Sequence, residues 1–169
     1  MGSNALDANT TGLRNTGIGA DCLTNNTTGE SNVAVGRDAM FHNSTGSNNT
    51  AVGRDALQNN STADSNTAVG ESALEENTTG SANVSVGANA LTANTTGGNN
   101  VAVGNNALDA NTTASSNIAI GHAALTDNTT GAQNVAVGRA ALGTNSTASC
   151  LLYTSPSPRD QRGSRMPAC

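Results

Sequence analysis

A glycine recurs every 17 residues along this chain, and this period constrains the fold more than any other feature of the sequence. Around each glycine the chain reads N-x-A-V-G-x-x-A-L-x-x-N-S/T-T-G/A-x-x, and we number these positions 1 to 17. Position 14 is Thr in all nine copies. A fixed period of this size is typical of a solenoid, in which each repeat stacks on its neighbours. The glycines at position 5 are Gly2, Gly19, Gly36, Gly53, Gly70, Gly87, Gly104, Gly121 and Gly138.

The repeat is too short for a pair of helices, because helical repeats need 33 residues or more. Positions 2 to 4 carry Val or Ile at i and i+2 around a small residue, as in Val33 and Val35 or Ile118 and Ile120. This alternation is typical of a β-strand. The Asn-Thr-Thr-Gly segment is typical of a turn. The sequence therefore predicts an all-β, parallel β-solenoid with one 17-residue coil per repeat over residues 1–149.

Stacked coils place equivalent side chains in ladders about 4.8 Å apart. We expect one buried Val/Ile ladder, one Leu ladder and Asn ladders with amide-to-amide hydrogen bonds; the alternative is that the Asn residues only favour turns. The members of the Val/Ile ladder are Val35, Val52, Val69, Val86, Val103, Ile120 and Val137. Those of the Leu ladder are Leu57, Leu74, Leu91, Leu108 and Leu125. Those of the first Asn ladder are Asn32, Asn49, Asn66, Asn83, Asn100, Asn117 and Asn134, and a second runs from Asn9 to Asn145 at position 12.

Small residues fill positions 3 and 8, where Cys22 is the exception in an otherwise all-Ala column at position 8. This face is either the thin interior of a narrow coil or a surface packed against an identical chain. A narrow coil has few large side chains to bury, so a single chain is marginally stable. We therefore expect an oligomer in which Ala-faced coils pack together.

The composition excludes several classes of protein. The chain has no Trp, no Lys, one Phe and one Tyr, which rules out a core built on aromatic side chains. A pI near 4.7 gives no basic surface for nucleic acid. No apolar run approaches the roughly 18 residues of a membrane-spanning helix. Cys22 is expected to be a small buried hydrophobe, and no disulfide framework is indicated.

The pattern stops at Cys150. Residues 150–169 hold all three Pro residues and carry three Arg and one Asp, whereas residues 1–149 carry four Arg and eleven acidic side chains. The string CLLYTSPSPRD over 150–160 resembles an in-frame translation of a transposase-type sequencing adapter. We therefore expect 150–169 to be a non-native or disordered tail without fixed structure, and 1–149 to be a fragment truncated at both ends.

Residues that could carry chemistry are sparse. His42 and His122 stand at different repeat positions, so a shared metal site or catalytic triad is not expected. Asp21, Asp38 and Asp55 stack at position 7 beside Arg residues at position 6, which favours an exposed ladder of alternating charge over a cation site. The nine N-S/T-T tripeptides are formal glycosylation acceptors that follow from the repeat itself. We predict no enzyme activity, and no catalytic, cofactor or metal site.

The segments NVAVGRDAM over 32–40 and NIAIGHAAL over 117–125 resemble the head repeats of YadA-type trimeric autotransporter adhesins. The 17-residue form with Asn-Thr-Thr-Gly also resembles arrays in bacterial and phage tail-fibre-like proteins. The resemblance implies a left-handed parallel β-roll that assembles as a homotrimer. It also implies display for attachment at a bacterial cell surface or outer membrane, or on a virion tail fibre. The usual adhesin head repeat is shorter, so one loop is expected to be longer here.

We therefore expect an extracellular attachment rod whose receptor is a host-cell, matrix or surface glycan or protein. The parent protein would be membrane-anchored or attached to a virion. Two alternatives remain: a purely structural solenoid and an ice-binding solenoid. Ice binding calls for an outward Thr-x-Thr strand, but Thr78 and Thr79 are adjacent and therefore point to opposite sides.

Overall fold

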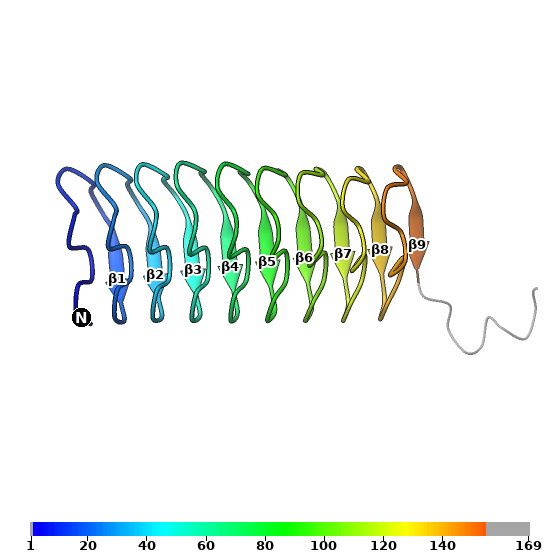
Figure 1. The fold of residues 1–169 in the computed structure, drawn as a ribbon, viewed down its shortest axis with the longest axis horizontal. Coiled ribbons are helices and arrows are strands. Elements are labelled where there is room, and N and C mark those ends of the chain that lie inside the picture. The colour runs from blue at the N-terminus through cyan, green and yellow to red at the C-terminus, as the bar shows by residue number, and fades with distance from the viewer. Residues whose placement is uncertain (1, 155–169) are drawn as a thin grey trace, which may run out of the picture.

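The described part of the chain folds into one parallel sheet of nine short strands. The structure, a computed structural model, describes residues 2–154. Figure 1 shows the coils stacked in chain order along the long axis, with one strand in each. The all-β solenoid expected from the repeat is confirmed. The strands are β1 (Thr16–Ile18), β2 (Val33–Val35), β3 (Thr50–Val52), β4 (Thr67–Val69), β5 (Val84–Val86), β6 (Val101–Val103), β7 (Ile118–Ile120), β8 (Val135–Val137) and β9 (Leu152–Thr154).

The register of the sheet equals the repeat, because every strand residue pairs with the residue 17 positions later, as Val52 does with Val69. Backbone hydrogen bonds continue this register around the rest of the coil. The Leu74 N–H donates to the Ala90 carbonyl of the next coil at 3.0 Å, and the Gly70 N–H donates back to the Val52 carbonyl at 2.8 Å. Each interior coil is therefore bonded to both of its neighbours.

Left-handed backbone conformations close the coil within 17 residues. Positions 7, 9 and 17 have positive φ in non-glycine residues, for example 52° at Ser72, 56° at Leu74 and 59° at Ala82. Position 5 needs glycine for two reasons: Gly70 has a φ of 137°, and a Cβ there would lie 2.6 Å from the carbonyl oxygen of Gly87. The invariant glycine of the repeat thus combines a positive φ with a close approach of successive coils.

The interior of the coil is narrow and lined by small side chains. The middle residue of β2 to β8 points inward: Ala68 in β4 is fully buried, and Ser85 replaces Ala in β5. Ala and Leu at positions 8 and 9, such as Ala73 and Leu74, fill the remaining space and are also fully buried. The Ala columns are therefore the thin interior of the coil, and they are not available for packing against an identical chain.

The Val/Ile ladder does not lie in the core, contrary to our expectation. Strand alternation is present, but its two faces are reversed: Val69 is 37% exposed and Ile120 is 40% exposed. The inward positions opposite the Leu ladder hold only small side chains, Ala or Ser in β2 to β8, and the larger β-branched side chains of these strands point outward. The expected members that are half-buried or exposed instead of buried are Val35, Val52, Val69, Val86, Val103, Ile120 and Val137.

The Leu ladder does lie in the core. Leu57, Leu74, Leu91, Leu108 and Leu125 are all fully buried, and Met40 takes the same place in its coil. Cys22 is fully buried in the column at position 8, and desolvation raises the pKa of its thiol. Cys22 is thus placed as the small hydrophobe that the sequence indicates.

The fold extends past the expected boundary at Cys150. β9 pairs in parallel with β8, and Tyr153 takes the register position opposite Ala136. The first residues of the segment expected to lack structure therefore continue the solenoid by one strand. The expectation for residues 155–169 lies outside the described residues.

Candidate functional surface

Two columns of buried asparagine connect the coils. At position 12, the Asn77 Nδ2 group donates to the Oδ1 of Asn60 at 3.0 Å and to the Gly80 carbonyl at 2.9 Å. The Oδ1 of Asn77 accepts from the Nδ2 of Asn94 at 2.9 Å. This chain of amide-to-amide bonds runs along the rod, so these side chains do more than favour a turn.

The second column, at position 1, is bonded differently. The Asn66 backbone N–H donates to the Oδ1 of Asn49 at 2.9 Å, and the Asn66 Nδ2 group donates to the Gly80 carbonyl at 2.9 Å. The Gly80 carbonyl therefore joins both columns within one coil. The asparagines of this column are all fully buried: Asn32, Asn49, Asn66, Asn83, Asn100, Asn117 and Asn134.

Burial of the asparagines makes most of the N-S/T-T tripeptides poor glycosylation acceptors. Asn26, Asn60 and Asn111 at position 12 are fully buried with their amides in the ladder. An enzyme that attaches a glycan needs access to the amide nitrogen, which here would require the coil to open.

The two threonines of the turn have different roles. The Thr78 hydroxyl at position 13 donates to the Thr95 carbonyl of the next coil at 3.0 Å, whereas Thr79 at position 14 is exposed. They face opposite ways, as the sequence predicts, and so do not form a Thr-x-Thr surface.

The main unpartnered surface is the outer face of the sheet, which we call the apolar strip. It consists of the outward side chains of β1 to β8, at positions 2 and 4, and every one of them is β-branched. The strip comprises Thr16, Ile18, Val33, Val35, Thr50, Val52, Thr67, Val69, Val84, Val86, Val101, Val103, Ile118, Ile120, Val135 and Val137.

The strip is long and narrow. Eight strands spaced about 4.8 Å apart make it roughly 38 Å long, and two columns about 6.6 Å apart make it roughly 10 Å wide. The resulting area of about 400 Å² lies in the range of the largest apolar patch on a typical monomer, about 300–600 Å², and such a patch is often functional. Sequence reasoning missed this surface, although β-branched residues on both sides of a small one in every coil were the signal.

Charged side chains lie beside the sheet on the turns that follow several of the strands. Arg37 approaches Asp38 at 3.2 Å, and Arg54 approaches Asp55 at 2.6 Å and also pairs with Glu71. Glu71 and Asp55 raise the pKa of the Arg54 guanidinium. The Arg side chains of these pairs are exposed, whereas Asp55 is buried and Asp38 is half-buried. Asp21 accepts a hydrogen bond from Asn4. The charges therefore form separate ion pairs in a few coils instead of the continuous exposed ladder that we expected, and pairs with a solvent-exposed partner stabilise a fold only weakly.

The structure does not bring the candidate chemical residues together. His42 contacts the Asn25 amide through Nδ1 at 3.2 Å, and His122 lies almost five coils further along the rod. Within residues 2–154, no group of three or more His, Cys, Asp or Glu side chains is placed to hold a metal ion. The same residues include no helix long and apolar enough to cross a membrane.

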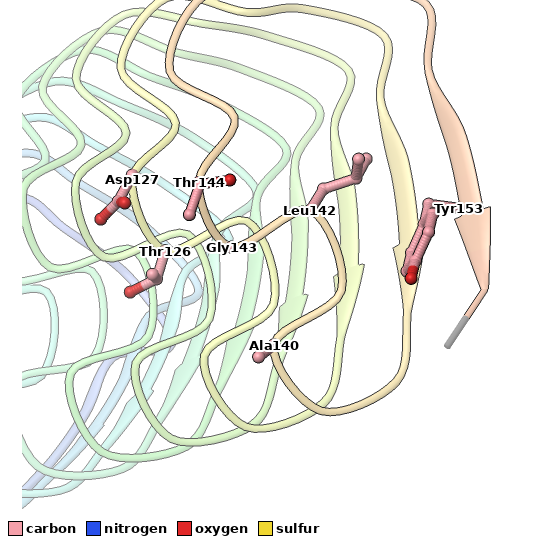
Figure 2. Close-up of a pocket in the computed structure, with 7 residues that line it drawn as sticks. All are labelled: Thr126, Asp127, Ala140, Leu142, Gly143, Thr144 and Tyr153. Carbon is pink, nitrogen blue, oxygen red and sulfur yellow. The ribbon is translucent and has the colours of Figure 1, made fainter. Parts of the chain in front are cut away.

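One cavity of about 520 Å³ opens at the C-terminal end of the rod (Figure 2). It lies between the last coil and β9, and its only ionisable side chains are Asp127 and Tyr153. The other residues that line it are Thr126, Ala140, Leu142, Gly143 and Thr144. A carboxylate and a phenol with no histidine, cysteine or cation beside them do not make an acid–base or nucleophilic set.

No family model, no curated protein and no solved structure matches this chain. The surface chemistry of the described residues is therefore the basis for assigning a function. The surface of the described rod carries one apolar strip, a few ion pairs and otherwise repeated polar turns.

Proposed function

We propose that this chain is a surface-exposed attachment rod that works as a homotrimer, as the head or stalk of an adhesin or the shaft of a tail fibre. The observation that carries the proposal is the apolar strip, because a continuous β-branched surface along a rod is suited to side-by-side association. The strip takes the place of the Ala columns as the oligomer interface.

The geometry of the strip favours three chains. A strip roughly 10 Å wide has only two columns of side chains, so two strips placed face to face would leave the edges of both exposed to water. Three strips around a common axis bring six columns together and enclose them. Identical chains related by such an axis form a closed assembly, whereas an unclosed arrangement would grow into a filament.

Attachment fits the rest of the surface. The exposed turns repeat the same polar groups in every coil, as with the Thr column at position 14 that includes Thr45 and Thr79. A trimer would present three such faces, so that individually weak contacts add to a high avidity. The resemblance of the repeat to adhesin heads and fibre arrays supports a location outside the cell, at a bacterial surface or on a virion.

An ice-binding function is the second candidate, and one observation favours it. The strip is a regular file of β-branched pairs at i and i+2, with Thr at position 2 in β1, β3 and β4. This function needs a strip that is open to water, so it requires a monomer. The oligomeric state therefore separates the two functions.

Binding of the fluorescently labelled chain to cultured epithelial cells and to immobilised extracellular matrix tests the attachment function. We expect retention of the wild-type chain and at least a tenfold weaker apparent affinity for a monomeric strip variant, Val69→Lys with Val103→Lys, because avidity is lost. Thr79→Lys, on an exposed turn, is the matched control for added charge. Equal retention of wild type and strip variant would contradict an attachment that depends on trimers, and no retention on either surface would favour a structural spacer.

A further inference from the structure

We propose that the two columns of the apolar strip have different places in the assembly: position 4 faces the threefold axis, and position 2 lies toward the outer edge. This inference rests on the proposed homotrimer and names the part of each chain that meets its two copies at the axis.

The polarity of the columns is the first argument. Position 4 is Ile or Val in all of β1 to β8, whereas position 2 is Thr in three of these strands. A hydroxyl buried without a hydrogen-bond partner is unfavourable, and the axis of a trimer is the part of the interface furthest from water. Thr16, Thr50 and Thr67 are therefore better placed near the edge, where water reaches their hydroxyls.

Exposure of the two columns is the second, independent argument. In the single chain, position 4 is exposed in six of the eight strands, and position 2 in four. The most exposed Val or Ile of the strip, Ile18 at 54%, stands at position 4. Apart from Ile18, the exposed Val and Ile residues are 36–40% exposed at position 4 and 36–37% exposed at position 2. Position 4 is therefore slightly the more exposed column as well as the more apolar one, so it has slightly more apolar surface to remove from water at the axis.

The groups that flank the strip differ between its two edges. Position 4 is followed by the invariant glycine, such as Gly70 after Val69, and then by a turn residue that is charged in several coils, as at Glu71. Position 2 is preceded by the buried Asn at position 1 and by the polar residue at position 17, such as Asn66 and Ser65 before Thr67. Both edges of the strip therefore carry polar groups, and the assignment of the two columns rests on the polarity and exposure of the columns themselves.

Disulfide trapping on one strand tests this placement. Thr67→Cys and Val69→Cys lie two residues apart on β4 and form a matched pair. Both are made in the full chain with Cys150→Ser and Cys169→Ser, whereas Cys22 stays because it is fully buried. A disulfide needs Cα atoms about 4.4–6.8 Å apart, which equivalent residues reach only close to the symmetry axis.

We expect mild oxidation to convert Val69→Cys into covalent dimers, up to two thirds of the chains, because three thiols at one axis can form one disulfide. Thr67→Cys is expected to give at least fivefold less. Sedimentation of the same samples under reducing conditions distinguishes the two proposals. A trimer in which Thr67→Cys cross-links as well as or better than Val69→Cys would overturn the placement alone, and a monomer would overturn the trimer together with it.

Discussion

At the residue scale, the stacking of the coils explains two of the invariant positions of the repeat. Glycine at position 5 combines a positive φ with a backbone contact to the next coil, and asparagine at position 12 connects three coils through one side chain. Both are constraints of stacking rather than of a single coil. The nine copies therefore keep these residues because each coil must match both of its neighbours.

Replacing the central glycine tests the close approach of the coils. Gly70→Ala would place a methyl group 2.6 Å from the Gly87 carbonyl oxygen in a left-handed region that β-carbons disfavour. We expect a loss of about 2–4 kcal/mol in the free energy of unfolding, measured by urea denaturation followed by circular dichroism. Gly98→Ala is the control, because other coils carry Ser115 or Ala132 at that position. An equal loss in the two variants would contradict a special role for position 5.

Removing one asparagine tests the ladder. Asn77→Ala would leave the Oδ1 of Asn60, the Gly80 carbonyl and the Nδ2 of Asn94 each short of one bond. We expect a loss of about 3–5 kcal/mol, since each unsatisfied buried polar group costs about 1–3 kcal/mol and part of this is relieved by the remaining bonds. Asn105→Ala, on an exposed turn position that is Ala in other coils, should change the free energy of unfolding by less than about 0.5 kcal/mol. A loss below 1 kcal/mol for Asn77→Ala would favour a turn-only role.

At the element scale, the period and the strand alternation could be predicted from the sequence. Which side chains of each strand face the core could not be inferred correctly. A V-A-V triplet is compatible with either face inward, and general hydrophobicity favours burying Val. The width of the coil decides the matter, because Leu57 and its equivalents already occupy the interior from the opposite wall. That width follows from the left-handed residues at positions 7 and 9, which a propensity for turns does not reveal.

Two neighbouring substitutions test which face of the strand points into the core. Ala68→Val adds two methyl groups to a fully buried inward position, so we expect a loss of about 1–3 kcal/mol from overpacking. Val69→Thr keeps the β-branched shape on the outer face, where the side chain is 37% exposed, and should cost less than about 1 kcal/mol in a protein diluted to monomer. Thermal unfolding at several protein concentrations separates the effect of each substitution on the single chain from its effect on association. The opposite ranking would mean that the Val ladder is the core.

The end of the repeat shows a second limit of sequence reasoning at this scale. The composition changes at Cys150, yet β9 forms because the backbone of β8 offers a ready edge with the correct register. Parallel pairing of backbone groups does not require the repeat sequence itself. A change in composition therefore located the end of the repeat but not the end of the described sheet.

At the scale of the whole molecule, the stability and the oligomeric state of the rod depend on what covers the apolar strip. The rod has a small interior, and about 400 Å² of β-branched surface remains open on one side. Covering this surface with two further copies would add burial to every coil at once, in line with a chain that lacks aromatic side chains. The free energy of unfolding should then rise with protein concentration.

Charge placed on the strip should dissociate the assembly. Val69→Lys with Val103→Lys introduces two like charges per chain into the proposed interface, where unpaired buried charges are strongly unfavourable. We expect the double variant to sediment as a monomer of 16.7 kDa while its far-ultraviolet circular dichroism remains that of a β-solenoid. Thr79→Lys should sediment like the wild type.

Sedimentation equilibrium of the unmodified chain is the most direct test of the central claim, that the apolar strip is the interface of a homotrimer. The account predicts a single species of about 50 kDa, three times the chain mass of 16.7 kDa, at micromolar concentrations. A single species at the chain mass over the same range would contradict it, because the strip would then be open to water in the functional protein.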